Sequence, residues 1–390
     1  MYKPVILIGN GCRSNPALVE HLCSLNIPVL TTWMAMDMVA EDNQAFCGRP
    51  GVFGQRAANI IQQSSDKIFV FGARLDNDQV AHRIDNFAPR AEKYIFDIDQ
   101  AELDKLPSSY GWFKSKSHDI TNFAGVEITG HPDPAWLPWC KALYNRFRPE
   151  LEGKTGEYVD PFYFQRILGD LLTPDDVIAL GSSGGAPVSF LQTFKIKKGQ
   201  RVTGCSTIGA MGADIPMAIG ACLGSGRRRT ICITGDGGFM LNVQELEVVR
   251  RLNLPIKFFV FNNNGYGSIR NMQNARFDGR HVGCDPESGL TLPPLKYIAL
   301  SYNIKYYQLV EKTHKWDDKI QQGIYSKDPV ELLTWALSDD RPLICEVMID
   351  PAYQQYPRVM STGFQADAME DMTPKLDPAE LKEIMDYGNT

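Results

Sequence analysis

A carboxylate between two glycines, followed 26 and 27 residues later by a pair of asparagines, constrains this chain more than any other feature. Asp236 comes directly after one apolar segment, and Asn262 and Asn263 come directly after another, Ile256–Phe261. The amphipathic stretch Phe239–Leu252 lies between them, so the order predicts strand, helix and strand. A unit of about 30 residues with this order places two parallel strand ends side by side. We therefore expect the carboxylate and the carboxamides to meet at the carboxyl edge of a sheet, where open α/β folds bind ligands.

The residue types at this edge suit a metal ion and a diphosphate. Oxygen ligands of this kind are typical of Mg²⁺, which keeps coordination positions for water and phosphate oxygens. The glycines on either side of Asp236 allow backbone amides to approach an anion closely. Gly-Asp-Gly or Asn-Asn-Asn-Gly alone would also fit an ordinary turn. Together, in this order and around this unit, they predict a metal–diphosphate site.

In these motifs the chain resembles the thiamine diphosphate enzymes, and it looks most like the large subunit of acetolactate synthase with its carboligase and decarboxylase relatives. The resemblance implies that Asp236, Asn263 and the backbone carbonyl of Gly265 hold Mg²⁺. It also implies that Met211, in the segment 209–220, bends the cofactor, although a lone Met in a Gly-rich segment is more often packing. The implied cofactor-binding residues are Met211, Gly235, Asp236, Gly237, Gly238, Asn263, Gly265, Tyr266 and Gly267.

The resemblance further implies a small 2-keto acid as substrate. Carboligation is the first expectation, simple decarboxylation is the second, and a non-catalytic nucleotide-binding or regulatory subunit is the third. Two departures leave the acceptor open: Gly238 stands where acetolactate synthases usually have Ser, and the family tryptophan that helps to choose the acceptor is missing after the Asn run. Anionic substrate could be held by Arg270, Arg276, Arg280 and His281, or these could form a solvated face.

The fold class expected is α/β, with two doubly wound parallel-sheet domains, because apolar strand segments alternate with helical stretches. The expected strands are Val5–Ile8, Ile27–Leu30, Lys67–Phe71 and Lys93–Asp97 in the first domain, and Asp176–Leu180, Thr230–Thr234, Ile256–Phe261 and Leu343–Ile349 in the second. We expect a central domain over 1–130, a linker over 131–157, a diphosphate- and Mg²⁺-binding domain over 158–350, and a C-terminal segment, 351–390, over the active site.

Glycine-rich turns follow several strands of the first domain, including Gly9-Asn10-Gly11 and Gly72-Ala73-Arg74. In acetolactate synthases the matching turns hold FAD, so FAD is the leading candidate for a nucleotide there. The same glycines could simply connect strands to helices, and both interpretations stay open. An ordinary dehydrogenase is excluded because no G-x-G-x-x-G opens a helix after the first strand. In the second domain, Ser182 and Ser183 could bond a diphosphate or form a plain turn.

No segment of the sequence resembles the pyrimidine-binding domain, which carries the glutamate that activates the cofactor in this family. Two domains of about 150–200 residues each account for the 390 residues. We therefore name no catalytic residue in this chain and expect the activating glutamate on a separate polypeptide, in a hetero-oligomer, unless the sequence is part of a longer chain.

Composition excludes several other classes. A net charge of −6 argues against a nucleic-acid surface, and no apolar run reaches the length of about 18 residues that a membrane-spanning helix needs. The nine cysteines contain no C-x-x-C pair and the six histidines show no ligand spacing, so we expect reduced thiols and no zinc. These features predict a cytoplasmic protein.

Overall fold

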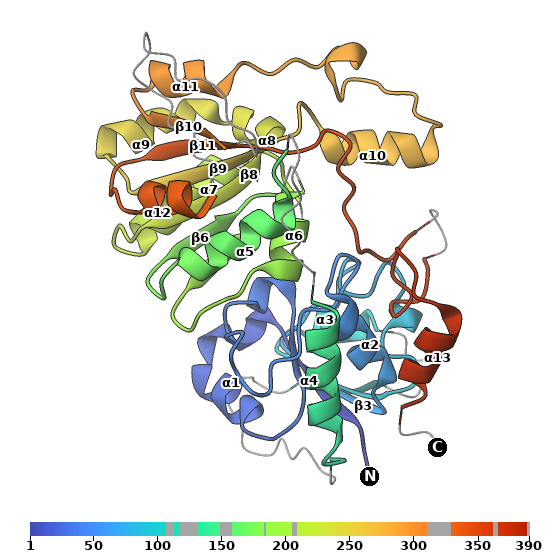
Figure 1. Cartoon of the computed structure of the whole chain (residues 1–390). Coiled ribbons are helices and arrows are strands. Elements are labelled where there is room, and N and C mark those ends of the chain that lie inside the picture. The colour runs from blue at the N-terminus through green and yellow to red at the C-terminus, as the bar shows by residue number, and fades with distance from the viewer. Residues whose placement is uncertain are drawn as a thin grey trace. The chain divides into compact units, whose positions relative to one another are not determined.

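The computed structural model describes residues 1–106, 113–117, 132–148, 158–182, 185–204, 209–309, 329–361 and 366–387. The chain divides into two compact units: unit 1 combines residues 1–148 with 356–390, and unit 2 contains residues 149–355. Each unit holds one parallel sheet with helices packed against it (Figure 1). The predicted fold class, two α/β units with parallel sheets, is therefore confirmed.

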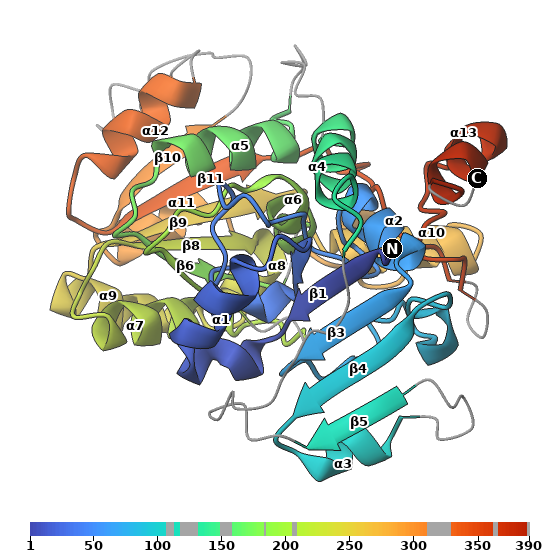
Figure 2. The ribbon, with the colours of Figure 1, turned by 90° about the horizontal axis from the view of Figure 1, so that it is seen from below.

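The sheet of unit 1 has five strands in the order β2-β1-β3-β4-β5, and Figure 2 shows β1, β3, β4 and β5 side by side. The first four strands lie where apolar segments predict them, to within two residues. The edge strand β5 was not predicted because its sequence, Phe-Lys-Ser-Lys-Ser, contains no apolar run. The strands are β1 Pro4–Ile8, β2 Val29–Thr31, β3 Lys67–Phe71, β4 Glu92–Asp97 and β5 Phe113–Ser117.

A helix in the expected linker belongs to unit 1. The indole N–H of Trp136, which is 1% exposed, donates to the Pro4 carbonyl over 2.8 Å. This contact ties the helix α4 to β1, and α4 also packs against α2. The helices of unit 1 are α1 Pro16–Cys23, α2 Arg56–Ser64, α3 Gln100–Asp104, α4 Trp136–Arg146 and α13 Pro378–Met385, with short 3₁₀ turns η1 Asn10–Ser14, η2 Trp33–Ala35 and η3 Ile84–Asn86.

The C-terminal segment also packs on unit 1. The amide of Val359 donates to the Val52 carbonyl over 2.8 Å, and Ile384 and Met385 of α13 lie in the hydrophobic core of this unit. The segment from Tyr356 onward is thus part of unit 1. Its expected position over the active site stays a prediction.

The sheet of unit 2 has six parallel strands in the order β10-β11-β9-β8-β6-β7. Four of them match the predicted strands. The other two, β7 and β10, were not predicted because their sequences, Arg-Val-Thr-Gly and Lys-Tyr-Tyr-Gln-Leu, are short and mixed in polarity. The strands are β6 Val177–Leu180, β7 Arg201–Gly204, β8 Thr230–Gly235, β9 Ile256–Asn262, β10 Lys305–Leu309 and β11 Leu343–Met348.

Alternate residues of β9 fill the two faces of this sheet. Phe259 and Phe261 both lie 5.4 Å, between ring centroids, from Phe164 of α5, whereas Phe258 lies 5.6 Å from Phe239 of α8 on the other face. A central strand buried on both faces is what a doubly wound sheet requires. The helices of unit 2 are α5 Pro161–Leu171, α6 Ala186–Thr193, α7 Asp214–Gly224, α8 Asp236–Met240, α9 Leu246–Leu252, α10 Gly267–Arg276, α11 Leu295–Ser301 and α12 Pro329–Leu337, with 3₁₀ turns η5 Val243–Glu245 and η6 Pro286–Ser288.

The single helix predicted over Phe239–Leu252 is divided into α8, η5 and α9, so that prediction was wrong in detail. Asn242 interrupts the helix with φ −133° and ψ 36°, and its side-chain amide donates to the Gly212 carbonyl over 2.7 Å. An Asn side chain that bonds a nearby carbonyl competes with helix hydrogen bonds. In the described ranges, every helix is too short or too polar to cross a membrane.

Substitution of Gly9 tests the backbone packing described for unit 1. A Cβ there would lie 2.1 Å from the Gly72 carbonyl oxygen, so Gly9→Ala should destabilise the chain by about 1–3 kcal/mol through overpacking. Gly220 in α7 has no heavy atom within 4 Å of such a Cβ, and Gly220→Ala should stabilise by up to about 1 kcal/mol through helix propensity. Urea denaturation followed by circular dichroism measures both. Equal midpoints for the two variants would contradict the packing described.

Candidate metal and diphosphate site

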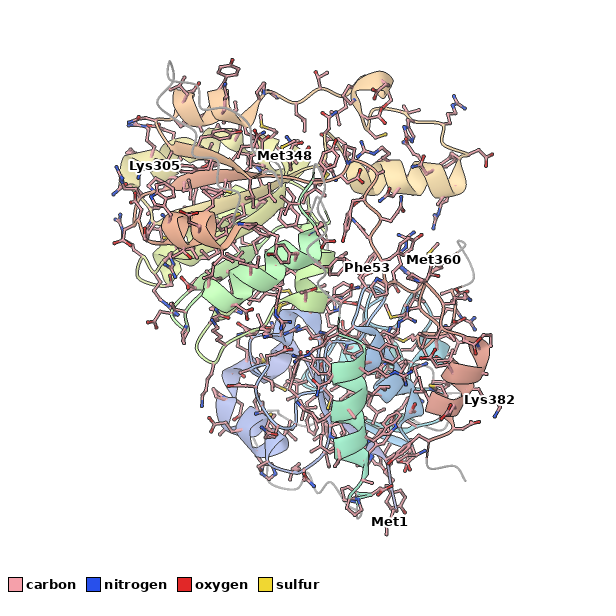
Figure 3. All side chains as sticks on the ribbon, in the orientation of Figure 1. Met1, Phe53, Lys305, Met348, Met360 and Lys382 are labelled. Atoms are coloured by element: carbon pink, nitrogen blue, oxygen red, sulfur yellow. The ribbon has the colours of Figure 1, made fainter. Side chains whose placement is uncertain are left out.

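The site residues gather at the carboxyl edge of the sheet of unit 2. Met348 ends β11 at this edge, and Lys305 begins the neighbouring parallel strand β10 at the opposite edge; both are labelled in Figure 3. The chain passes from β6 to β7 on one side, while β8 pairs with β6 on the other side. The junction of β6 and β8 is therefore a switch point of the kind at which open α/β sheets bind ligands. Gly235 ends β8 at this junction.

Asp236 is a buried carboxylate whose two oxygens accept backbone hydrogen bonds. Gly237 donates to Oδ1 over 2.8 Å and Gly265 donates to Oδ2 over 2.9 Å, so the second bond brings the β9 loop to the end of β8. Burial raises the pKa of Asp236 to about 6, against the opposing effects of these amides and of Arg270, while Glu346 raises it further. Among the described residues no Lys, Arg or His forms an ion pair with Asp236. A cation would compensate this buried charge.

Asn263 supplies an orphaned acceptor beside this carboxylate. The residue is 5% exposed, and its buried Oδ1 has no hydrogen-bond partner in the part of the chain that the structure describes. A buried acceptor without a partner costs about 1–3 kcal/mol. A bound cation would remove this cost, because an amide oxygen is a good ligand for a hard metal ion.

Gly265 has a backbone conformation that favours glycine, with φ of 134°. A Cβ there would lie 2.3 Å from the Cys284 carbonyl oxygen. The amide of the next residue, Tyr266, donates to that same carbonyl over 2.9 Å. The Gly265 amide bond to Asp236 brings the Asn263–Gly265 loop to this carboxylate. A carboxylate, a carboxamide oxygen and a backbone carbonyl together would form an all-oxygen set of the kind that fits Mg²⁺.

The glycines around Asp236 leave room for neighbouring side chains. A Cβ on Gly237 would lie 2.4 Å from Cε1 of Tyr266 and 3.4 Å from Cε of Met211. Met211 itself is 38% exposed, so its thioether is accessible. Gly235, Gly237 and Gly238 are buried at the end of β8 and the start of α8, and their expected contact with a diphosphate stays a prediction.

Gly267 packs closely against the Asn263 side chain, and its expected contact with the cofactor stays a prediction. A Cβ on Gly267 would lie 2.3 Å from Nδ2 of Asn263. Arg270, one turn further along α10, donates to the Asn263 carbonyl over 3.0 Å and to the Pro351 carbonyl over 2.7 Å. Both residues thus hold Asn263 in place, and Arg270 is buried in this structural contact. Of the other basic residues considered for an anion, Arg276 and Arg280 are exposed.

Asp214 is a site residue that the sequence did not reveal. It is fully buried at the start of α7, where it accepts a bond of 2.7 Å from the Thr234 hydroxyl of β8 and one of 3.3 Å from the Ser182 amide after β6. Burial raises the pKa of Asp214. The Ser182 hydroxyl donates to the Ala210 carbonyl over 2.9 Å, beside Met211. Asp214 therefore joins the elements around the switch point; Ser183 lies outside the described residues.

A cavity of about 340 Å³ opens beside Asp236. Its polar wall contains Glu346, which is 6% exposed and accepts bonds from Asn262 Nδ2 over 2.5 Å, from Gln308 Nε2 over 3.0 Å and from the Tyr306 hydroxyl. Tyr306 and Gln308 lie on β10, and they were not among the expected site residues because that strand was not predicted.

The raised pKa of Asp236 predicts a pH-dependent metal affinity. In the metal-free chain, protonation of Asp236 stabilises the folded state relative to the unfolded state. This stabilisation is fully present below pH 3.8, the ordinary pKa of Asp, and is lost as pH rises through about 6, the pKa in the folded chain. Because Mg²⁺ competes with that proton, its affinity should fall about tenfold per pH unit below about 6 and level off above about 7. Calorimetric Mg²⁺ titrations across this range measure it. An affinity that stays constant throughout would show that Asp236 is not a ligand.

Gly267→Ala should weaken Mg²⁺ binding without changing any ligand. Its Cβ would push the Asn263 amide away, and we expect a loss of about 10–100-fold, as for other supporting contacts of a metal ligand. Ser268→Ala, at the exposed next position, serves as the matched control. Equal affinity in both variants would mean that Asn263 does not bind the ion.

Comparison with known proteins identifies the family to which the two domains are similar. Residues 2–112 match the thiamine pyrophosphate enzyme central domain, and residues 182–332 match the C-terminal thiamine pyrophosphate-binding domain of the same enzymes. The chain is 28% identical over 378 residues to the acetolactate synthase isozyme 2 large subunit of Escherichia coli, covering 95% of this chain and 64% of that protein. It is 26% identical over 382 residues to the acetolactate synthase large subunit of Cyanidium caldarium, covering 96% and 62%.

The chain thus spans less than two thirds of the length of these relatives. Both matched segments lie within the two units described above, and the second contains Asp236, Asn263 and Gly265. Thiamine pyrophosphate is another name for thiamine diphosphate, so the matches agree with the resemblance found in the motifs. The chain carries the central domain and the C-terminal cofactor-binding domain of the thiamine pyrophosphate enzymes.

Proposed function

We propose that this chain is the diphosphate-binding subunit of a thiamine diphosphate-dependent 2-keto acid carboligase similar to acetolactate synthase. One observation carries the proposal: the buried carboxylate of Asp236, without a cationic partner among the described residues, lies by a buried amide oxygen of Asn263 that has no partner there. Both stand at neighbouring strand ends, within the segment that matches the cofactor-binding domain. A metal ion between them would satisfy both groups.

Each site residue has a separate task in this proposal. Asp236, Asn263 and the Gly265 carbonyl hold Mg²⁺, which in turn binds the diphosphate. When bound, the cofactor would supply a nucleophilic carbon and an electron sink for the decarboxylation of a 2-keto acid. Met211, accessible beside Gly237, supports the bent form of the cofactor. Asp214 and Thr234 keep the end of β8 next to the loop after β6.

The activating glutamate is proposed to come from a separate polypeptide with a pyrimidine-binding domain. The matched segments are the central and the C-terminal cofactor-binding domains, neither of which carries that residue in the family that the sequence resembles. The chain would then need this partner, as a hetero-oligomer, for turnover. A 2-keto acid such as pyruvate is the proposed donor, since the similar proteins are acetolactate synthases.

A flavin forms no part of the proposal. The glycines of the turns in unit 1 are explained by the approach of one backbone to another, because the Gly11 amide donates to the Gly72 carbonyl over 3.0 Å and a Cβ on Gly9 would overlap that carbonyl. No glycine of these two turns therefore needs a nucleotide to explain it.

Asp236→Ala should abolish Mg²⁺-dependent binding of thiamine diphosphate. The loss should exceed about 100-fold, beyond what the loss of a supporting contact costs, because the ion loses its only charged ligand. Asp175→Ala, which removes an exposed carboxylate before β6, is the matched control. Isothermal titration with the chain in its native complex measures both, and an unchanged affinity in Asp236→Ala would refute the site.

The products formed from pyruvate separate the possible reactions. The native complex should consume pyruvate with release of CO₂ and form a carbon–carbon bond. Acetaldehyde as the sole product would indicate the decarboxylase, and saturable cofactor binding without turnover, in a complex that includes a pyrimidine-binding domain, would favour the non-catalytic subunit.

A further inference from the structure

The segment that follows the metal loop has little apolar packing of its own. Figure 1 shows α10 lying away from the sheet of unit 2, and the residues that α10 buries are Gly267 and Arg270. Beyond it, Phe277 and Val282 are 56% and 64% exposed. A substructure with so small an apolar core needs another kind of cross-link to hold one conformation.

Three metal-ligating side chains meet in this segment. His281 Nδ1 lies 2.7 Å from Asp285 Oδ2, and Cys284 Sγ lies 3.7 Å from the same oxygen. All three ligand atoms are within 4.8 Å of one another. Gln273 Oε1, on α10, lies 3.4 Å from the thiol sulfur. One nitrogen, one sulfur and one carboxylate oxygen thus lie close together, with the Gln273 oxygen beside the sulfur.

The surroundings of His281 are those of a metal ligand. Its other ring nitrogen, Nε2, lies 2.7 Å from the Asn274 side-chain oxygen. If Nε2–H donates there, the Nδ1 lone pair faces the Asp285 carboxylate, and two acceptors then oppose each other at 2.7 Å. A cation between them resolves the conflict, and a metal-bound His commonly donates its second N–H to an oxygen in this way.

Asp285 is oriented for the same task. Its Oδ1 accepts from the Ser288 amide over 3.0 Å and from the Ser288 hydroxyl over 2.6 Å, which leaves Oδ2 directed at His281. Cys284 is fully buried, and the described residues place no disulfide partner near it. The carboxylate and the thiol are therefore fixed before any ion binds, which lowers the entropy that binding costs.

We propose that His281, Cys284 and Asp285 form a zinc site, with Gln273 Oε1 or water as the fourth ligand. Zn²⁺ prefers four ligands of mixed nitrogen, sulfur and oxygen type at about 2.0–2.3 Å, and small movements of these side chains provide that geometry. Binding replaces the thiol proton, so the thiolate and the carboxylate together neutralise the ion. Mg²⁺, which prefers oxygen ligands, would not compete here.

The site would stabilise the loop that carries the Mg²⁺ ligands. The Cys284 carbonyl accepts from the Tyr266 amide over 2.9 Å, and it would also lie 2.3 Å from a Cβ on Gly265. Zinc bound to Cys284 would therefore fix the position of the backbone segment that contacts Gly265 and Tyr266. The zinc site itself does not depend on the proposed carboligase function, because none of its ligands belongs to the diphosphate site.

Cobalt substitution tests the proposal on the whole chain. Bound metal is first removed by chelation and dialysis, with Mg²⁺ present. The chain should then bind one equivalent of Co²⁺. The bound ion should show thiolate charge-transfer absorption in the near ultraviolet and the visible bands of a tetrahedral ion. Added Zn²⁺ should abolish this spectrum and raise the thermal midpoint. Co²⁺ binding without a thiolate band would overturn the proposal.

Variants locate the ion. Cys284→Ser should remove the thiolate band and weaken Zn²⁺ binding by more than about 100-fold, beyond the effect of losing a supporting contact. His281→Gln, a half-exposed position that can change without a buried cavity, should also lower Zn²⁺ affinity. Cys23→Ser, at a half-buried cysteine of unit 1, is the control and should match the unmodified chain.

Two results separate this site from the diphosphate site. Asp236→Ala should keep the cobalt spectrum in full, whatever becomes of its thiamine diphosphate binding. Equal Zn²⁺ affinity in Cys284→Ser, His281→Gln and the unmodified chain would mean that bound zinc is adventitious, and the cluster would then be a hydrogen-bonded turn only.

Discussion

A buried negative charge at the end of β8 is the constraint on which the rest of unit 2 depends. Asp236 is 3% exposed, and its carboxylate is held by two backbone amides without an ion pair among the described residues. Such a group is tolerated when a ligand compensates it. The buried side-chain oxygen of Asn263, which follows the neighbouring strand, also lacks a partner among the described residues and would be stabilised by a ligand. We propose that both groups belong to one coordination sphere, which a bound cation would complete.

Steric room at three glycines allows this sphere to form. Gly237 admits the Tyr266 ring, Gly265 admits the Cys284 carbonyl, and Gly267 admits the Asn263 amide, each within 2.4 Å of where a Cβ would lie. Only at Gly265 does the backbone itself require glycine. The other two are constrained by the side chains that pack on them. The glycine-rich motif is thus a packing requirement as much as a diphosphate cradle.

The sequence predicted what local patterns determine. Apolar strands such as β3 and β9 were predicted closely. The spacing of Asp236 and Asn263 indicated that they follow neighbouring parallel strands, as β8 and β9 are. The strands β5, β7 and β10 were not predicted because their sequences lack apolar runs. Their absence from the prediction also hid Tyr306 and Gln308, which stand on β10.

Contacts between residues that lie far apart in the sequence could not be predicted from local patterns. Asp214 joins α7 to β8 through Thr234, and nothing in its local sequence marks it as more than a helix start. The spacing of His281, Cys284 and Asp285 differs from the usual zinc patterns, and their meeting depends on a loop closed by Gln273. The expectation that zinc is absent rested on spacing alone, whereas the folded loop brings a ligand set together.

We propose that Asp236, Asn263 and the Gly265 carbonyl together hold a metal ion that binds a diphosphate. A crystal structure of the native complex with Mn²⁺ and thiamine diphosphate tests it most directly, because Mn²⁺ replaces Mg²⁺ on oxygen ligands and can be located by anomalous scattering. We expect one anomalous peak in contact with these three oxygens and with the diphosphate. A peak elsewhere, with Asp236 still bonded only to its two amides and the Asn263 oxygen still without a partner, would contradict it.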